Sequence, residues 1–166
     1  IATFTIPKIL DSGSSSKYNA IAKEFAATIS EAHQQLKLNG QLSVNTSGND
    51  FTPYFNYVKV DTVSTFDDNP TLGPLSCAAG RSCLQLHNGA IITYFTSTFL
   101  TTDSTSTISF ELDPDGKVND IDGLNFYLYY NGLIRDDGTL APNTMFNGGP
   151  RIASPSLVPS WFSWSN

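Results

Sequence analysis

The stretch SKYNAIAKEFAATISEAHQQLKLN, residues 16–39, decides the fold of this chain. Its apolar side chains recur at steps of three and four residues, a spacing that gathers them on one face of an α-helix. Asn39-Gly40 offers a left-handed stop at the C-terminal end, and the serines at 14–16 offer caps if the helix begins there. The residues of the expected buried face are Tyr18, Ile21, Ala22, Phe25, Ile29, Ala32 and Leu36.

Upstream of this helix, residues 1–10, IATFTIPKIL, are mostly apolar. The run is shorter than the roughly 20 residues that a bilayer-spanning helix requires, and it lacks the basic region and cleavage site of a signal peptide. We therefore expect either mature sequence or the remnant of a longer segment, and the apolar start without Met favours the remnant. Pro7 and Gly13 either kink one long helix or separate two helices, and the sequence leaves both open.

From residue 41 onward the apolar pattern changes to a period of two, which is typical of half-buried β-strands. Apolar and polar residues alternate along 107–112 and 124–130. Asn88-Gly89 and Asn131-Gly132 are favoured two-residue hairpin turns, so an antiparallel meander is expected. We expect a further strand at 54–61, and loops at 62–82 and 136–166, where Pro, Gly, Ser and Asn are frequent.

These patterns predict one α+β domain, with a long N-terminal α-helix packed on an antiparallel β-sheet and a loop-rich C-terminal tail. Residues 1–40 form the helical part, and residues 41–166 form the β-sheet head. The tail contains both tryptophans, Trp161 and Trp164. It forms either a strap over the core or an exposed contact patch, and we favour the strap.

The charge of the chain argues against a nucleic-acid partner. Its formal net charge is −6, and only nine basic residues are scattered along it, whereas phosphate binding needs clustered Lys and Arg. Charged residues make up only 14% of the chain, so Ser, Thr, Asn and Gln must cover much of the surface. Such a neutral polar surface is common outside the cytoplasm.

Cysteine and histidine positions favour a disulfide over a metal or catalytic site. Cys77 and Cys83 bracket a short Gly-containing loop and are expected to form a disulfide in an oxidising compartment. His33 and His87 show no ligand-like spacing, so we expect no zinc. We place His33 near the polar side of the helix and His87 at an exposed or cross-strand position. Because no G-x-S-x-G motif is present, we predict that the chain is not an enzyme.

Five oxygen-bearing side chains lie within ten residues, and a hard cation such as Ca²⁺ prefers such ligands. The EF-hand pattern fails because Gly116 comes two residues too early and no Glu closes the loop. Two interpretations stay open, a calcium site and a solvated turn rich in Asp and Asn. The residues are Asp113, Asp115, Asn119, Asp120 and Asp122.

Aromatic residues along the expected strands could stack against sugars, although sheet packing alone accounts for them. We favour sheet packing. The set comprises Tyr54, Phe55, Tyr57, Tyr94, Phe95, Tyr127, Tyr129 and Tyr130.

Two segments resemble type IV pilins and the pseudopilins of type II secretion. Residues 1–10 look like the later part of that family's hydrophobic N-terminal helix, with Pro7 at its helix-kinking proline. Residues 113–132 are similar to the acidic, glycine-punctuated segment before the last long strand of many bacterial pilin-like proteins. The family's opening motif, a glycine at the cleavage site followed by Phe and an acidic residue, is absent. We therefore expect the chain to begin about fifteen residues into the mature protein.

The resemblance implies a structural subunit of an extracellular type IV pilus-like or pseudopilus filament on a bacterial cell surface. Its partners would be copies of itself, the assembly machinery and, before assembly, the inner membrane. The assembly interface would comprise Ile1, Phe4, Ile6, Pro7, Ile9 and Leu10. The simpler alternative for these residues is a hydrophobic terminus packed on its own domain. The alternative function is a secreted carbohydrate- or surface-binding adhesin module, favoured by the tyrosine-rich strands and low charge.

Overall fold

The computed structural model describes the backbone over residues 2–62, 64–67, 74–77, 81–94, 98–102, 106–119, 121–132, 134–135 and 158–163, and the side chains of these residues from Ser15 onward, except that of Arg135. A single helix, α1 (Ala2–Leu38), opens the chain. Pro7 and Gly13 both lie within α1, so they do not divide it into two helices. A 3-10 helix, η1 (Gly48–Tyr54), follows.

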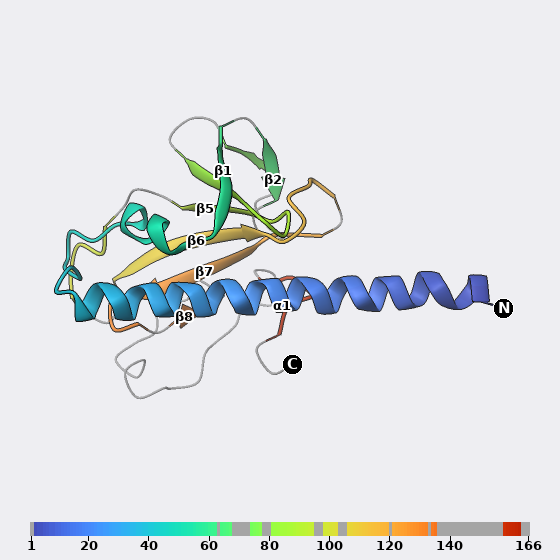
Figure 1. Ribbon diagram of the computed structural model, residues 1–166, viewed down its shortest axis with the longest axis horizontal. Helices are drawn as coiled ribbons and strands as arrows, with labels where there is room; N and C mark the ends of the chain where they lie inside the picture. Colours follow the sequence, from blue (N-terminus) through green and yellow to red (C-terminus); the bar gives the residue numbers. More distant parts are fainter. Residues whose placement is uncertain are drawn as a thin grey trace.

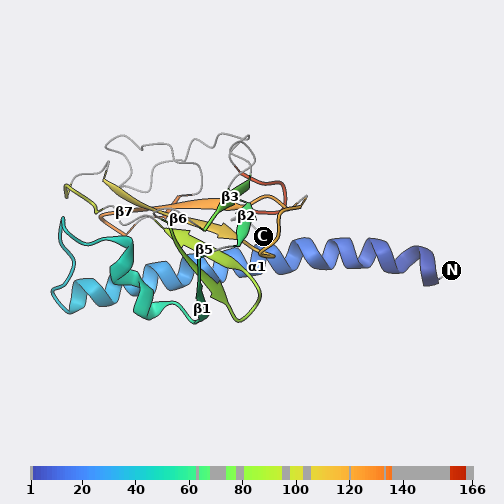
Figure 2. The ribbon, with the colours of Figure 1, turned by 90° about the horizontal axis from the view of Figure 1, so that it is seen from above.

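Six strands form one antiparallel sheet in the order β1-β4-β5-β6-β7-β8. The α+β class, with a long N-terminal helix against an antiparallel sheet, is therefore confirmed. Figures 1 and 2 show α1 lying across one face of this sheet. The strands are β1 (Tyr57–Asp61), β4 (Ser82–Leu86), β5 (Ile91–Tyr94), β6 (Thr107–Asp113), β7 (Leu124–Tyr129) and β8 (Ile134–Arg135).

Two sequence-based boundaries are wrong. The strand expected at 54–61 begins only at Tyr57, because Tyr54 ends η1. The region 62–82, expected to be a loop, contains the small antiparallel sheet of β2 (Thr65–Asp67) and β3 (Pro74–Ser76). Each of these strands is three residues long, too short for an alternating pattern to stand out. Of the tail at 136–166, only 158–163 are described, and they form a turn.

Both predicted Asn-Gly dipeptides lie at strand connections. Asn88-Gly89 joins β4 to β5, where the Ala90 N–H donates to Asn88 Oδ1 at 3.1 Å. Asn131-Gly132 joins β7 to β8, and the Gly132 N–H donates to the Tyr129 carbonyl at 2.8 Å. Gly89 and Gly132 have φ of 89° and 93°, backbone conformations that glycine adopts without the steric penalty of a Cβ atom.

The core lies between α1 and the sheet. On the expected buried face of α1, six residues are buried and Tyr18 is partly buried against them, so that prediction is confirmed. Phe25 contacts Phe110 of β6 and Phe126 of β7 edge-on, with ring centroids 6.2 and 5.8 Å apart. Because each large buried side chain contributes about 2 kcal/mol through apolar burial, this contact fixes α1 on the sheet.

Candidate functional site

The candidate assembly element is the N-terminal part of α1. The side chains of Ser15, Ser16 and Lys17 are exposed, and Tyr18 is the first of the described side chains of α1 that packs against the core. The sixteen residues from Ala2 to Lys17 extend about 24 Å along the helix axis at 1.5 Å per residue. In both ribbon views this end of α1 projects past the edge of the sheet (Figures 1 and 2).

The residues predicted for the assembly interface fall on this projecting segment. Phe4, Ile6, Pro7, Ile9 and Leu10 lie within α1, and their side chains are outside the described residues. Ile1 lies outside the described residues altogether. Their role in assembly therefore stays a prediction. Over the described part of the chain, no helix combines the length and the hydropathy needed to cross a bilayer.

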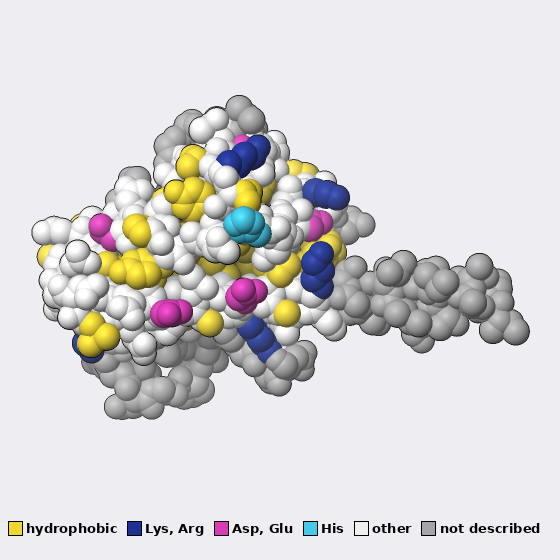
Figure 3. Space-filling view, in the orientation of Figure 1, with side chains coloured by type: hydrophobic (Ala, Val, Ile, Leu, Met, Phe, Trp, Pro, Cys, Tyr) yellow, Lys and Arg dark blue, Asp and Glu magenta, His cyan; other side chains and the backbone are white. Residues whose placement is uncertain are grey.

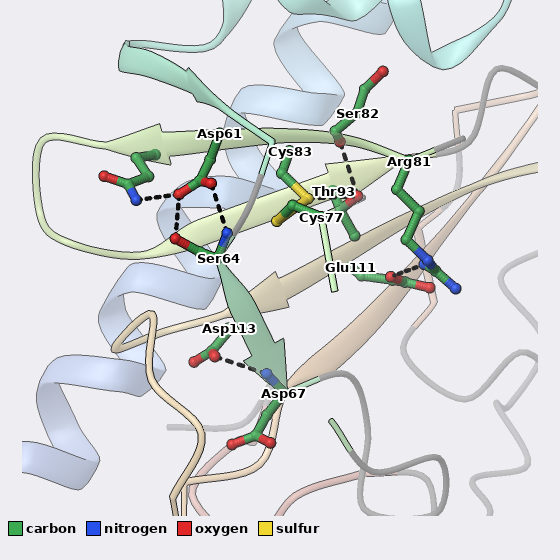
Figure 4. Close-up of a disulfide and its surroundings, with 11 residues drawn as sticks. Asp61, Ser64, Asp67, Cys77, Arg81, Ser82, Cys83, Thr93, Glu111 and Asp113 are labelled. Carbon is green, nitrogen blue, oxygen red and sulfur yellow. Dashed lines mark hydrogen bonds and ion pairs between the residues drawn. A yellow bond between two sulfur atoms is a disulfide. The ribbon is translucent and has the colours of Figure 1, made fainter. Parts of the chain in front are cut away.

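The predicted disulfide between Cys77 and Cys83 is present, with the two Cα atoms 5.7 Å apart (Figure 4). It joins the end of β3 to β4, and so ties the small β2-β3 sheet to the main sheet. Both half-cystines are buried with Phe66 and Ile91 in a second, smaller apolar cluster. The β2-β3 sheet is thus attached by the covalent link, by this apolar cluster and by the hydrogen bond from the Asp67 N–H to Asp113.

The acidic segment folds back on its own backbone. Asp113 accepts hydrogen bonds from the backbone N–H groups of Asp67 at 2.9 Å, Gly116 at 3.1 Å and Asp115 at 3.3 Å. Asp115 accepts a backbone N–H from Lys117 at 3.0 Å. These contacts are those of a turn rich in Asp, one of the two interpretations left open by the sequence.

Within this segment Asp113 is fully buried. Burial raises the pKa of its carboxyl to about 8, and a side-chain hydrogen bond with Asp115 and the charge of Asp115 act in the same direction. Asp67, brought beside it by β2, accepts the Asn119 N–H at 3.1 Å. Burial also raises the pKa of Asp67, and the charges of Asp122 and Asp115 add to this effect.

The calcium interpretation of this segment stays a prediction, because Asp120 lies outside the described residues. Among the residues that are described, no three His, Cys, Asp or Glu side chains form a group suited to a metal ion. No local sequence pattern points to Asp67, which lies 46 residues before Asp113 and approaches it only through the fold.

His33 differs from its expected position near the polar side of α1. It is buried, and its Nε2–H donates to the Tyr130 carbonyl at 2.8 Å. Burial lowers the pKa of His33 below its usual range. Its ring also packs on Gly132, where an added Cβ would lie only 3.1 Å from the imidazole. His33 therefore has a structural role in holding the β7-β8 turn against α1. His87 is exposed beside the β4-β5 turn, as expected.

The aromatic residues of the strands serve mainly as core. Phe55, Tyr94 and Tyr129 are buried, and Phe55 and Tyr94 pack around Phe110. Tyr57 differs, since its side chain is exposed on β1. Phe95 lies outside the described residues.

The C-terminal segment 158–163 forms the strap favoured by the sequence. Phe162 is buried against Phe126, and Trp161 contacts Tyr18 of α1 edge-on at 6.2 Å between ring centroids. The Trp161 Nε1–H donates to the Asp122 carbonyl at 2.8 Å. Trp164 lies outside the described residues.

No family model, no curated protein and no solved structure matches this chain.

Proposed function

We propose that this chain is the structural subunit of an extracellular filament of the type IV pilus or type II secretion pseudopilus kind, which assembles through the N-terminal part of α1. The observation that carries the proposal is the division of α1 at Tyr18. From Tyr18 onward the helix packs on its own sheet, and before it the helix projects past the sheet edge.

The physical reason lies in the composition of the projecting part. Residues 1–10 are mostly apolar, and a projecting apolar helix needs cover that its own head domain does not supply. A bilayer can cover it before assembly, and other copies of the chain can cover it afterwards. Repeated head-to-tail contacts between identical subunits generate an open helical filament when the rotation does not close into a ring.

The head domain is suited to a passive, exported role. Side chains of its core such as Phe110, Phe126 and Leu128 are fully buried. The Cys77–Cys83 disulfide favours an oxidising compartment, as expected for a subunit displayed at the cell surface. In this proposal the chain acts by self-assembly and not by catalysis, and its other partners are the inner membrane and the assembly machinery.

The proposal is tested by expressing the full-length protein in its own cells and examining fractions sheared from the surface. Immunogold electron microscopy should detect fibres containing the chain. Phe4→Asp combined with Ile9→Asp should abolish these fibres, because charged residues would then occupy the assembly helix. Gln34→Asp combined with Gln35→Asp adds the same charge at exposed positions on the part of α1 that packs on the head. This double variant serves as the matched control and should leave the fibres intact.

Folding of each variant is checked by formation of the Cys77–Cys83 disulfide in the recovered protein. If the unmodified protein stays monomeric in membranes and yields no fibres, the filament proposal is wrong. A glycan array probed with the same protein then tests the adhesin alternative, which requires saturable binding without assembly.

A further inference from the structure

One face of the molecule carries an unusual edge strand. β1 is the first strand in the sheet order and pairs only with β4 in the described part of the chain. Its first four residues are all exposed, and three of them are apolar, with exposed fractions of 38% for Tyr57, 54% for Val58 and 58% for Val60. The β-bulge between Tyr57 and Lys59 and the charge of Lys59 disfavour direct strand pairing at this edge, so a partner would dock through the exposed side chains.

A hollow of about 190 Å³ lies next to this strand, between α1 and the β4-β5 turn. Its apolar lining comes from Ile21 and Phe25 of α1 and Leu86 of β4, and its polar lining includes Glu24, Asn56 and His87. Asn56 directly precedes β1, so the hollow and the exposed strand adjoin each other. An apolar cavity of about 150 Å³ can hold benzene, so this hollow is large enough for one aromatic ring.

The charges on this face are complementary, and within the described part of the chain they form no ion pair with each other or with other residues. Lys59 is exposed at the centre of β1, and Glu24 is exposed at the hollow. Arg81 and Glu111 form the one ion pair found among the described residues, so neither Lys59 nor Glu24 has an ion-pair partner there. Figure 3 views this face, with acidic side chains over α1 and a basic side chain over the lobe that contains β1.

The placement of the two features fits a two-fold symmetric contact. Figures 1 and 2 agree that β1 and α1 reach the same side of the molecule. A two-fold axis parallel to α1 therefore brings β1 of each copy opposite the hollow of the other, and it produces every contact twice. The same axis leaves both α1 helices pointing in one direction, so both N-terminal ends can enter the same membrane.

We propose that a second copy of this chain docks on this face, with the Tyr57 ring of each copy in the hollow of the other and Lys59 of each beside Glu24 of the other. The register of β1 against β4 shifts between Tyr57 and Lys59, so their side chains leave opposite faces of the strand. Both side chains are exposed on the outer edge of the sheet, so a partner that meets this edge can contact both. The contact also covers Val58 and Val60. This pairing is separate from the filament contact of α1 and does not depend on it.

The test uses sedimentation equilibrium of the full chain in the Phe4→Asp/Ile9→Asp background, so that association through the helix end does not contribute. The interface is small, so pairing should be weak and detectable at high protein concentration. Lys59→Glu or Glu24→Lys alone places like charges at both equivalent contacts and should weaken pairing roughly 30-fold. A mixture of these two variants should form heterodimers, because each contact then joins opposite charges.

Two matched controls separate docking from general charge effects. Glu31→Lys makes the same change about two helical turns further along α1, where the residue does not line the hollow. This variant should leave pairing unchanged. Tyr57→Phe should keep pairing, whereas Tyr57→Ser should weaken it. Circular dichroism checks that each variant is folded. The proposal is overturned if the parent chain is monomeric at all accessible concentrations, if the Lys59→Glu and Glu24→Lys variants fail to pair with each other, or if Glu31→Lys acts as Glu24→Lys does. None of these outcomes affects the fibre test, so the two proposals stand or fall separately.

Discussion

At neutral pH the buried Asp113 carboxyl carries a proton that it loses in the unfolded chain, so we expect Asp113→Asn to change the pH dependence of stability. The pKa of Asp113 rises from 3.8 to about 8 on folding. Because folding raises this pKa, the contribution of Asp113 to the free energy of unfolding is fully present below pH 3.8. It is lost progressively as the pH rises from 3.8 through about 8. Between these limits, one proton of difference corresponds to a fall of about 1.4 kcal/mol per pH unit in the free energy of unfolding.

The assay is urea unfolding of the full chain at several pH values between about 5 and 7, in the presence of EDTA so that no divalent cation compensates the carboxylates. Over this interval the Asp113 contribution amounts to roughly 3 kcal/mol. Asp113→Asn preserves the side-chain shape but cannot titrate. Its single amide oxygen can replace either Oδ2, which accepts the Asp67 N–H, or Oδ1, which accepts the Gly116 N–H, so the variant should be less stable at every pH. The dependence on pH, and not the absolute stability, therefore reports the titration of Asp113. We therefore expect the free energy of unfolding of the variant to fall less steeply with pH than that of the parent, by about 1.4 kcal/mol per pH unit.

Glu31→Gln, which removes an exposed carboxyl from α1, is the control. Its free energy of unfolding should change with pH in parallel with that of the parent chain. If Asp113→Asn also runs parallel to the parent, the buried carboxyl does not hold a proton at neutral pH. In that case the three backbone N–H donors, which favour the carboxylate, outweigh burial.

Four further outcomes are expected. Replacing both Cys77 and Cys83 with Ala should lower the free energy of unfolding in urea by about 2 kcal/mol, from the loop entropy of a bridge spanning six residues. Because the pKa of His33 is lowered on folding, its contribution to stability is fully present above 6.5 and is lost as the pH falls from 6.5 through the lower pKa of the folded state. His33→Gln should therefore reduce the acid sensitivity of the melting temperature. Gly132→Ala should destabilise the chain by about 1 kcal/mol more than Gly89→Ala, because both have positive φ but only Gly132 lies against His33. If the acidic segment binds calcium, EDTA should lower the melting temperature and added Ca²⁺ should restore it, whereas an unchanged melting temperature would contradict the calcium site.

The parts of the fold that could be predicted are those specified by local pattern. The 3.6-residue period of α1 identifies its buried face, because packing on a flat sheet requires one continuous apolar stripe. The alternation in β6 and β7 and the Asn-Gly turns identify the antiparallel strands. β2 and β3 could not be predicted in this way, since three residues give no measurable period and their position depends on a disulfide to β4.

The site residues that were missed depend on contacts between distant segments. Nothing local to His33 indicates burial, since its hydrogen-bond acceptor, the Tyr130 carbonyl, lies 97 residues away. The association of Asp67 with Asp113 likewise depends on β2 packing beside β6. In contrast, Cys77 and Cys83 could be paired from the sequence because they are close along the chain and no other cysteine competes.

The direction in which α1 leaves the head domain is set by contacts between segments far apart in the sequence. Residues 11–16 of α1, DSGSSS, are all weak helix formers, so the helix alone resists bending poorly there. Just after this stretch, Tyr18 packs against Trp161, and Asn19 Oδ1 accepts the Ser163 N–H at 3.0 Å. Trp161 is in turn bound to the Asp122 carbonyl. The strap and the acidic segment thus hold α1 at the point where it leaves the sheet. In the proposed filament, force on the N-terminal part of α1 would therefore pass to the head through these contacts as well as through the core.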